Sequence, residues 1–226
     1  RERETLVGEA TRLINRVKSA LARLGISHFN PKPKTAAEKL GDLRLPDGEP
    51  VPPNALDEMR RDLERRQLIE AQIRAIEKTR LSRIAEAPAS KPNVMLLLLA
   101  RVIGIGLETA DTLVSEILTR NLRDRRAVAR YGGLTGAPRR SGGMDREQGL
   151  ARTGNVRVRT AMVGLAWRFV RLQPDSELVK WFKARTAGTR GLRKTMIVAL
   201  ARKLLLALWR FVNDGVVPQG VALRPA

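Results

Sequence analysis

The hydrophobic pattern of the first fifty residues predicts one amphipathic helix followed by a proline-rich connector. Between Glu4 and Leu24, apolar residues recur at intervals of three, four and seven, which is the spacing of one helix face; they are Leu6, Leu13, Ile14, Val17, Leu21 and Leu24. Gly25 ends this pattern. The next segment, Ile26 to Pro53, contains six prolines and cannot sustain a long element, although Thr35 to Leu40 fits a short helix.

A second helix is predicted to run from Asn54 to Glu86, a stretch without proline or glycine. Asn54 is a suitable N-cap, and two acidic residues follow it in the first turn. The apolar positions form a narrow stripe that favours a helical hairpin or coiled coil; they are Leu56, Met59, Leu63, Ile69, Ile73 and Ile76. Two interpretations stay open, namely a dimerisation or spacer arm and a helix packed on its own domain.

Pro88 to Pro92 interrupts the helical pattern and suggests a boundary between an arm, residues 1–90, and a C-terminal domain, residues 91–226. After a helical stretch from Val94 to Val102, Gly104 and Gly106 precede another apolar run at helical spacing. This order predicts a helix-hairpin-helix, whose turn presents backbone amides to a nucleic-acid phosphate. A dinucleotide-binding loop and a purely structural turn are the alternatives.

Six glycines between Gly132 and Gly149 predict an irregular loop between two helical segments. Beyond it, Asn155 is placed to cap a helix that runs through Leu172. Strand signals are sparse throughout. The predicted fold class is therefore mainly α, with an N-terminal helical hairpin or coiled-coil arm followed by an α-helical domain that contains the helix-hairpin-helix.

Composition excludes several classes of function. The 226 residues include no cysteine and one histidine, His28, so thiolate metal sites, disulfides and schemes that need two histidines are excluded. We assign no metal site to this chain. The longest apolar stretches are too short for a bilayer or contain Arg202 and Lys203, so no membrane span is expected. We expect a soluble, cytoplasmic protein.

The charge points to nucleic acid. The chain has 43 basic and 23 acidic side chains, a net charge of +20, and residues 91–226 alone carry 25 basic and 9 acidic ones. Between Arg120 and Arg159 there are eleven arginines and no lysine, which favours phosphate recognition over general solubility. A solvated cationic face is the alternative. The candidate nucleic-acid-binding residues are Gly104, Gly106, Arg139, Arg140, Gly142, Gly143, Arg152, Asn155, Arg157 and Arg159.

Ser141 is the candidate nucleophile. It follows two arginines and precedes two glycines, which places a hydroxyl in a cationic, closely approachable segment. Local sequence alone does not distinguish this serine from the many that occur in glycine-rich loops. Three tryptophans, Trp167, Trp181 and Trp209, occupy helical positions beside apolar residues and are expected in the core.

Several of these segments together closely resemble the C-terminal domain of the insertion-sequence 110/116/902 family of transposases. The resemblance covers about Leu96 to Gly215, and Arg1 to Gly25 is similar to the helical segment that follows the family's first domain. The shared motifs are Ile-Gly-Ile-Gly at 103–106, Tyr-Gly-Gly-Leu-Thr-Gly at 131–136, Arg-Ser-Gly-Gly at 140–143, Thr-Gly-Asn-Val-Arg-Val-Arg at 153–159 and Ile-Val-Ala-Leu-Ala-Arg-Lys-Leu-Leu at 197–205.

The resemblance implies a DNA transposase that is guided by a structured bridge RNA and that cuts and exchanges DNA strands through a serine nucleophile. Ser141 matches the position of that serine. In the family, a RuvC-like domain with Mg²⁺-binding acidic residues precedes the helical segment. Nothing precedes Arg1 in this sequence, so we expect the metal to belong to that domain and the chain alone to be inactive.

Two functions follow as hypotheses. The first is an enzyme, the C-terminal part of a DNA transposase, with DNA, guide RNA and further copies of the chain, in a dimer or tetramer, as partners. The second is a transposase remnant that binds DNA or RNA and has no catalytic activity. A structural or protein-interaction module is a third possibility, but it leaves the arginines unexplained.

Overall fold

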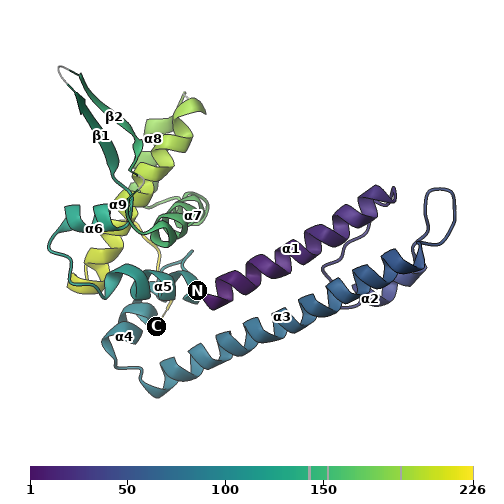
Figure 1. The fold of residues 1–226 in the computed structure, drawn as a ribbon. Helices are drawn as coiled ribbons and strands as arrows, with labels where there is room; N and C mark the ends of the chain where they lie inside the picture. Colours follow the sequence, from purple (N-terminus) through teal and green to yellow (C-terminus); the bar gives the residue numbers. More distant parts are fainter. Residues whose placement is uncertain (142–143, 152, 189, 226) are drawn as a thin grey trace. The chain divides into compact units, whose positions relative to one another are not determined.

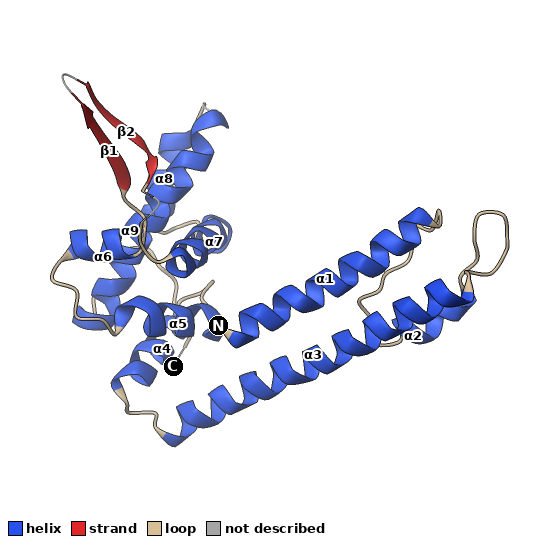
Figure 2. Ribbon diagram, viewed as in Figure 1, coloured by secondary structure: helices blue, strands red, loops and turns tan. Residues whose placement is uncertain are grey.

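The computed structural model describes residues 1–141, 144–151, 153–188 and 190–225, and for 137–141, 144–148 and 190 it describes the backbone alone. The chain forms two compact units, Arg1–Glu86 and Ala87–Ala226. The described residues are mainly helical, as the sequence predicts (Figure 2).

The first unit is a helical hairpin. Helix α1, Glu2–Arg23, ends just before Gly25, whose φ of 77° is the left-handed conformation that glycine adopts most readily. A short helix α2, Ala36–Lys39, and a 3-10 turn, Leu40–Asp42, interrupt the connector. Helix α3 spans Pro53–Glu86. The predicted N-cap at Asn54 is wrong, because the fixed φ of Pro53 suits the first helical position and the helix begins there.

Helices α1 and α3 run antiparallel (Figure 1). Arg3 near the start of α1 pairs with Glu77 near the end of α3, and Arg16 pairs with Asp62. The apolar core gathers where the connector packs between the two helices. Its buried members are Val17, Leu21, Ile26, Ala36, Leu40, Val51, Met59 and Leu63.

The second unit is built around three helices, α7 (Val156–Leu172), α8 (Glu177–Thr186) and α9 (Arg193–Asp214). Their facing sides supply fully buried side chains such as Phe169, Phe182 and Leu204. Helices α4 (Lys91–Arg101) and α5 (Leu107–Leu113), a π-helical turn (Val114–Leu118) and α6 (Arg125–Tyr131) complete the unit. A 3-10 turn at Arg190–Leu192 precedes α9.

The glycine-rich segment is a β-hairpin, which corrects the prediction of an irregular loop. Strand β1, Gly136–Ser141, pairs antiparallel with β2, Met144–Leu150, and the register places Gly136 opposite Leu150 and Ser141 opposite Met144. The hairpin projects from the helices (Figure 1). The sequence gives little sign of it, because pairing between strands satisfies the backbone without requiring alternating apolar residues.

None of the helices in the described part of the chain combines the length and the apolar character that a membrane crossing requires.

Candidate nucleic-acid interface

The base of the hairpin is closed by two glycines that touch. A Cβ on Gly154 would lie 2.5 Å from Cα of Gly133, so only glycine fits, and both residues have positive φ. The backbone N–H of Asn155 donates to the Tyr131 carbonyl at 2.7 Å, and the backbone N–H of Ala151 donates to the Thr135 carbonyl at 3.0 Å. The end of α6 and the start of α7 are thereby fixed to each other, and the hairpin emerges from this junction.

The predicted cap at the start of α7 is confirmed. The Asn155 side-chain oxygen accepts from the backbone amides of Arg157 and Val158, at 3.0 and 3.2 Å. Its amide nitrogen donates to Glu116 at 2.9 Å. Asn155 was also predicted to bind nucleic acid, but here its side chain links α7 to the π-helical turn.

Glu116 lies on that turn and is buried, with 7% of its surface exposed. It accepts from Asn155 and forms an ion pair with Arg157. A carboxylate removed from water in this way needs such partners. Glu116 therefore holds two of the predicted nucleic-acid-binding side chains.

Arg159 lies one turn after Asn155 on α7 and is half-buried. Its guanidinium donates to the Thr153 carbonyl at 3.1 Å and packs where a Cβ on Gly133 would be. The Nε atom of Arg159 is buried without a partner in the described structure. This arginine supports the base of the hairpin.

The two glycines of the α4–α5 connection differ in role. Gly104 has a φ of 98° and packs near Leu172 and Phe169 of α7, whereas Gly106 is exposed and precedes α5. The turn is fixed to the C-terminal end of α7, because the side-chain amide of Gln173 donates to the Ile103 carbonyl at 2.8 Å. The order helix, glycine turn, helix is present, and its use for nucleic acid stays a prediction.

These two groups of predicted residues do not form one site. Gly104 packs against the C-terminal end of α7, whereas Asn155 and Arg159 lie at its N-terminal end. The helix has 17 residues, so the groups are separated by roughly 20–25 Å at 1.5 Å per residue. A nucleic acid that contacts both must extend along the domain.

The remaining predicted residues belong to the hairpin or adjoin it. Arg139, Arg140 and Ser141 are the last three residues of β1, so Ser141 lies at the end of the strand remote from the hairpin base. Gly142, Gly143 and Arg152 lie outside the described residues.

A cavity at the hairpin base was not predicted. It has a volume of about 420 Å³ and is lined by Arg126 and Arg130 of α6 and by Arg202 of α9, together with Thr135, Gly136, Ala151 and Thr153. The arginine-rich composition was the only sequence signal for this cavity. Its lining could not be predicted, because Arg202 comes from a helix some seventy residues further along the chain.

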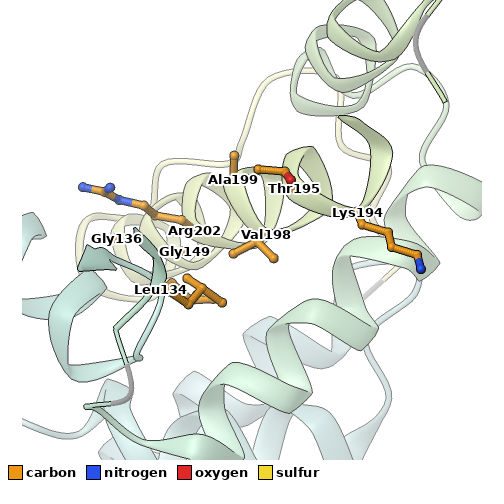
Figure 3. A pocket seen from close by; sticks show the side chains of 9 residues that line it. Leu134, Gly136, Gly149, Lys194, Thr195, Val198, Ala199 and Arg202 are labelled. Carbon is orange, nitrogen blue, oxygen red and sulfur yellow. The ribbon is translucent and has the colours of Figure 1, made fainter. Parts of the chain in front are cut away.

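An adjoining cavity of about 440 Å³ shares Gly136 and Arg202 with the first. Its walls are more apolar, with Leu134, Leu150, Val198 and Ala199 among the lining residues. Figure 3 shows Lys194 and Arg202 at opposite ends of its α9 wall. We call the two cavities together the basal cleft.

Comparison with known proteins gives two matches. Residues 97–180 match the profile described as "Transposase IS116/IS110/IS902 family". A protein of Sinorhizobium fredii named "Putative transposase y4rJ" is 40% identical over 234 aligned residues, which cover 99% of this chain and 59% of that protein. Residues 97–180 are thus similar to a transposase domain of this family. The chain spans about three fifths of the length of the relative that it matches.

The matched segment runs from α4 into α8 and includes the whole hairpin. Arg202 lies beyond this segment. Among the described residues, no group of three or more His, Asp or Glu side chains is placed to hold a metal ion. The side chains of Asp145 and Glu147, on β2, are outside that description.

Helix α6, which carries two arginines of the basal cleft, is capped by Asp124. Its carboxylate accepts from the Ala127 amide at 2.7 Å. This backbone hydrogen bond, and to a smaller extent the charge of Arg123, lowers the pKa of Asp124. The carboxylate that caps α6 is therefore ionised at neutral pH.

Proposed function

We propose that this chain is the part of an insertion-sequence transposase that supplies the serine nucleophile for cutting and exchanging DNA strands. The observation that carries the proposal is the place of Ser141, which follows two arginines and ends β1 of a projecting hairpin inside the family-matched segment. A serine at the end of an extended hairpin is suited to reach a DNA backbone that the bulk of the domain cannot approach.

The proposed reaction has two transfers at phosphorus. In the first, Ser141 Oγ forms a bond to the phosphorus of a DNA phosphodiester while the bond to one bridging oxygen breaks. The Oγ proton passes to a base, and the departing deoxyribose oxygen takes up a proton. In the second, a hydroxyl oxygen of the partner DNA strand forms a bond to the same phosphorus while the bond from phosphorus to Ser141 Oγ breaks. The attacking hydroxyl gives its proton to a base, and Ser141 Oγ takes up a proton and is again a free alcohol.

The transition state gains negative charge on the phosphoryl oxygens, and cations near Ser141 would stabilise it. We assign this role to Arg139 and Arg140, which precede Ser141. The ion pair of Arg157 with buried Glu116 supports a positioning role for Arg157.

A serine hydroxyl is weakly acidic, so its attack needs a base or a metal ion. We propose that Mg²⁺, held by a RuvC-like domain of the longer protein, supplies this activation. We also propose a structured guide RNA as the source of sequence choice, and an assembly of two or four copies that brings two DNA partners together. The described residues offer no metal cluster, so no step is assigned to an ion bound by them.

The test is a covalent protein–DNA adduct. The chain, alone and within a protein extended to the length of its relative, is incubated with guide RNA and an oligonucleotide carrying the transposon end, and adducts are resolved on denaturing gels. Ser141→Ala should abolish the adduct, because no other hydroxyl occupies that position of the hairpin. Ser82→Ala, an exposed serine of α3, is the matched control and should leave it unchanged.

The competing function is a transposase remnant that binds nucleic acid without cutting it. It predicts salt-sensitive binding like the enzyme, because both neutralise phosphates with arginine. If the extended protein forms no adduct while still binding DNA, the serine chemistry is wrong and the binding module is the better description.

A further inference from the structure

The basal cleft has the composition of a nucleotide-binding site. Its cationic part is lined by Arg126, Arg130 and Arg202, which come from two different helices. None of the three forms an ion pair with a carboxylate among the described side chains, and all three residues are exposed. Three cations gathered around one cavity repel one another, so a bound anion would stabilise the arrangement.

The groups between the arginines favour a phosphate rather than a carboxylate-bearing protein surface. Thr135 and Thr153 add hydroxyls to the same cavity. Arginine binds phosphate through two parallel hydrogen bonds, and hydroxyls supply further donors to the same oxygens. The cavity opens at the base of the hairpin, where the chain passes from α6 into β1 and from β2 toward α7.

The apolar part of the cleft adds a surface against which the sugar and base of a nucleoside can pack. Leu134, Val198 and Ala199 line it, and Lys194 and Thr195 lie on its α9 wall (Figure 3). The two parts share Gly136 and Arg202 and therefore adjoin each other. Volumes of about 420 and 440 Å³ fall within the range of roughly 300–1,000 Å³ that holds small organic ligands.

The walls of the cleft are preorganised. The junction of Gly133 and Gly154 fixes the hairpin base, and Asp124 caps the helix that carries Arg126 and Arg130. Leu134, between them, is buried with 2% of its surface exposed. Ligand binding therefore does not require these elements to form first, which lowers the entropic cost of binding.

We propose that the basal cleft binds one unpaired nucleotide of a nucleic-acid strand, with its phosphate among Arg126, Arg130 and Arg202 and its sugar and base over Leu134, Val198 and Ala199. This inference rests on the proposed nucleic-acid function and adds to it a second contact, separate from the reacting phosphate. The base is unpaired because a base already paired in a duplex cannot enter a cleft of this size.

The bound nucleotide is distinct from the one that Ser141 attacks. Gly136 lines the cleft and Ser141 is five residues along β1, which separates them by about 17 Å at 3.3–3.4 Å per residue. At 3.4 Å per nucleotide along one strand of a B-form duplex, this equals about five nucleotides. The cleft thus holds a strand in position while the hairpin reaches further along it.

The experiment measures binding of the whole 226-residue chain to fluorescein-labelled strands by anisotropy over a series of salt concentrations. The variants are Arg130→Gln, Arg202→Gln and the double variant. Arg125→Gln and Arg210→Gln are matched controls, since each is an exposed arginine of the same helix that does not line the cleft. Thermal unfolding verifies that all of them fold.

The double variant should bind single-stranded DNA at least about tenfold more weakly, and its salt slope should fall by about 0.7, the value for one phosphate of a single strand. An abasic strand should bind the wild type more weakly than the intact strand, and the duplex should lose less affinity in the variant than the single strand does. A parallel series with RNA tells which kind of strand occupies the cleft.

Equal losses in the cleft variants and in the control variants would overturn the site. Equal binding of abasic and intact strands would overturn the assignment of a nucleoside to the apolar part. These results are independent of the serine chemistry, because no strand is cut in the assay. If the cleft variants weaken binding but no adduct ever forms, the cleft stands and the proposed transposase reaction fails.

Discussion

At the scale of single residues, Glu116 changes how the arginine-rich segment is understood. The sequence groups Asn155, Arg157 and Arg159 as nucleic-acid ligands because they follow one another in a basic stretch. In the structure, Glu116 bonds the first two, and Arg159 bonds the Thr153 carbonyl. Glu116 is 41 residues from Arg157, so the local sequence contains no signal for this pair. The cap at Asn155 was predictable because capping depends on neighbouring residues alone.

Substitutions at Asn155 should separate its two bonds. Asn155→Ala removes both the cap and the bond to Glu116 and should cost about 1–2 kcal/mol of unfolding free energy. Asn155→Ser keeps a capping oxygen and should cost less. Urea unfolding followed by circular dichroism measures both. If Asn155→Ser leaves stability intact but sharply weakens DNA binding, the side chain has a direct role in recognition.

The cap at Asp124 predicts that the stability of the folded chain depends on pH in the acidic range. Its pKa is lowered in the folded chain by the Ala127 amide, so the ionised cap contributes stability above the ordinary aspartate pKa. This contribution is lost as the pH falls through the lowered pKa. Asp124→Asn keeps a neutral cap and should therefore unfold at a lower temperature than the wild type at neutral pH.

The difference in unfolding temperature between the wild type and Asp124→Asn should shrink as the pH falls below about 4, the usual aspartate value. Thermal melts across this range provide the measurement. A difference that stays constant with pH would mean that the charge of Asp124 does not act through folding.

At the scale of elements, the helices were predictable and the hairpin was not. The apolar periodicity of α1 and the cap of α7 have local causes that a sequence displays. The hairpin depends on pairing between residues that show no apolar alternation, and on Gly133 and Gly154, which meet only after folding. The basal cleft was out of reach for the same reason, since α9 supplies one of its walls.

The glycine contact at the hairpin base should be sensitive to a single methyl group. Gly154→Ala forces alanine to a φ of 96°, which costs about 1–2 kcal/mol, and places Cβ in overlap with the backbone of Gly133. A larger total loss is expected. Gly164→Ala, on an exposed and open position of α7, should instead be neutral or stabilising by up to about 1 kcal/mol. Chemical unfolding of the two variants gives the comparison, and similar costs for both would argue against a closed junction.

At the scale of the whole molecule, charge divides along the same line as the fold. The unit Arg1–Glu86 has 18 basic and 14 acidic side chains, a net charge of +4, and the second unit has a net charge of +16. Several acidic side chains of the first unit are paired internally, as Asp62 is with Arg16 and Arg65. The second unit therefore carries most of the potential that attracts a polyanion.

Residues 87–226, produced alone, should unfold cooperatively and keep most of the affinity of the full chain for DNA, together with most of its salt dependence. Residues 1–86 should bind weakly and with a small salt slope, because few of their cations are in excess. Anisotropy titrations of the two fragments test this. Tight binding by residues 1–86 would place the main contact surface on the arm instead.

The junction beneath the hairpin has a practical meaning for protein engineering. Thr135 and Ala151 are hydrogen-bonded neighbours, so the polypeptide departs and returns at one point of the helical scaffold. A segment with adjacent ends behaves as an exchangeable cassette, which can be excised or swapped with that of a homologue while the scaffold keeps its packing. Chimaeras made at these two positions would show which properties travel with the transplanted piece and which stay with the recipient.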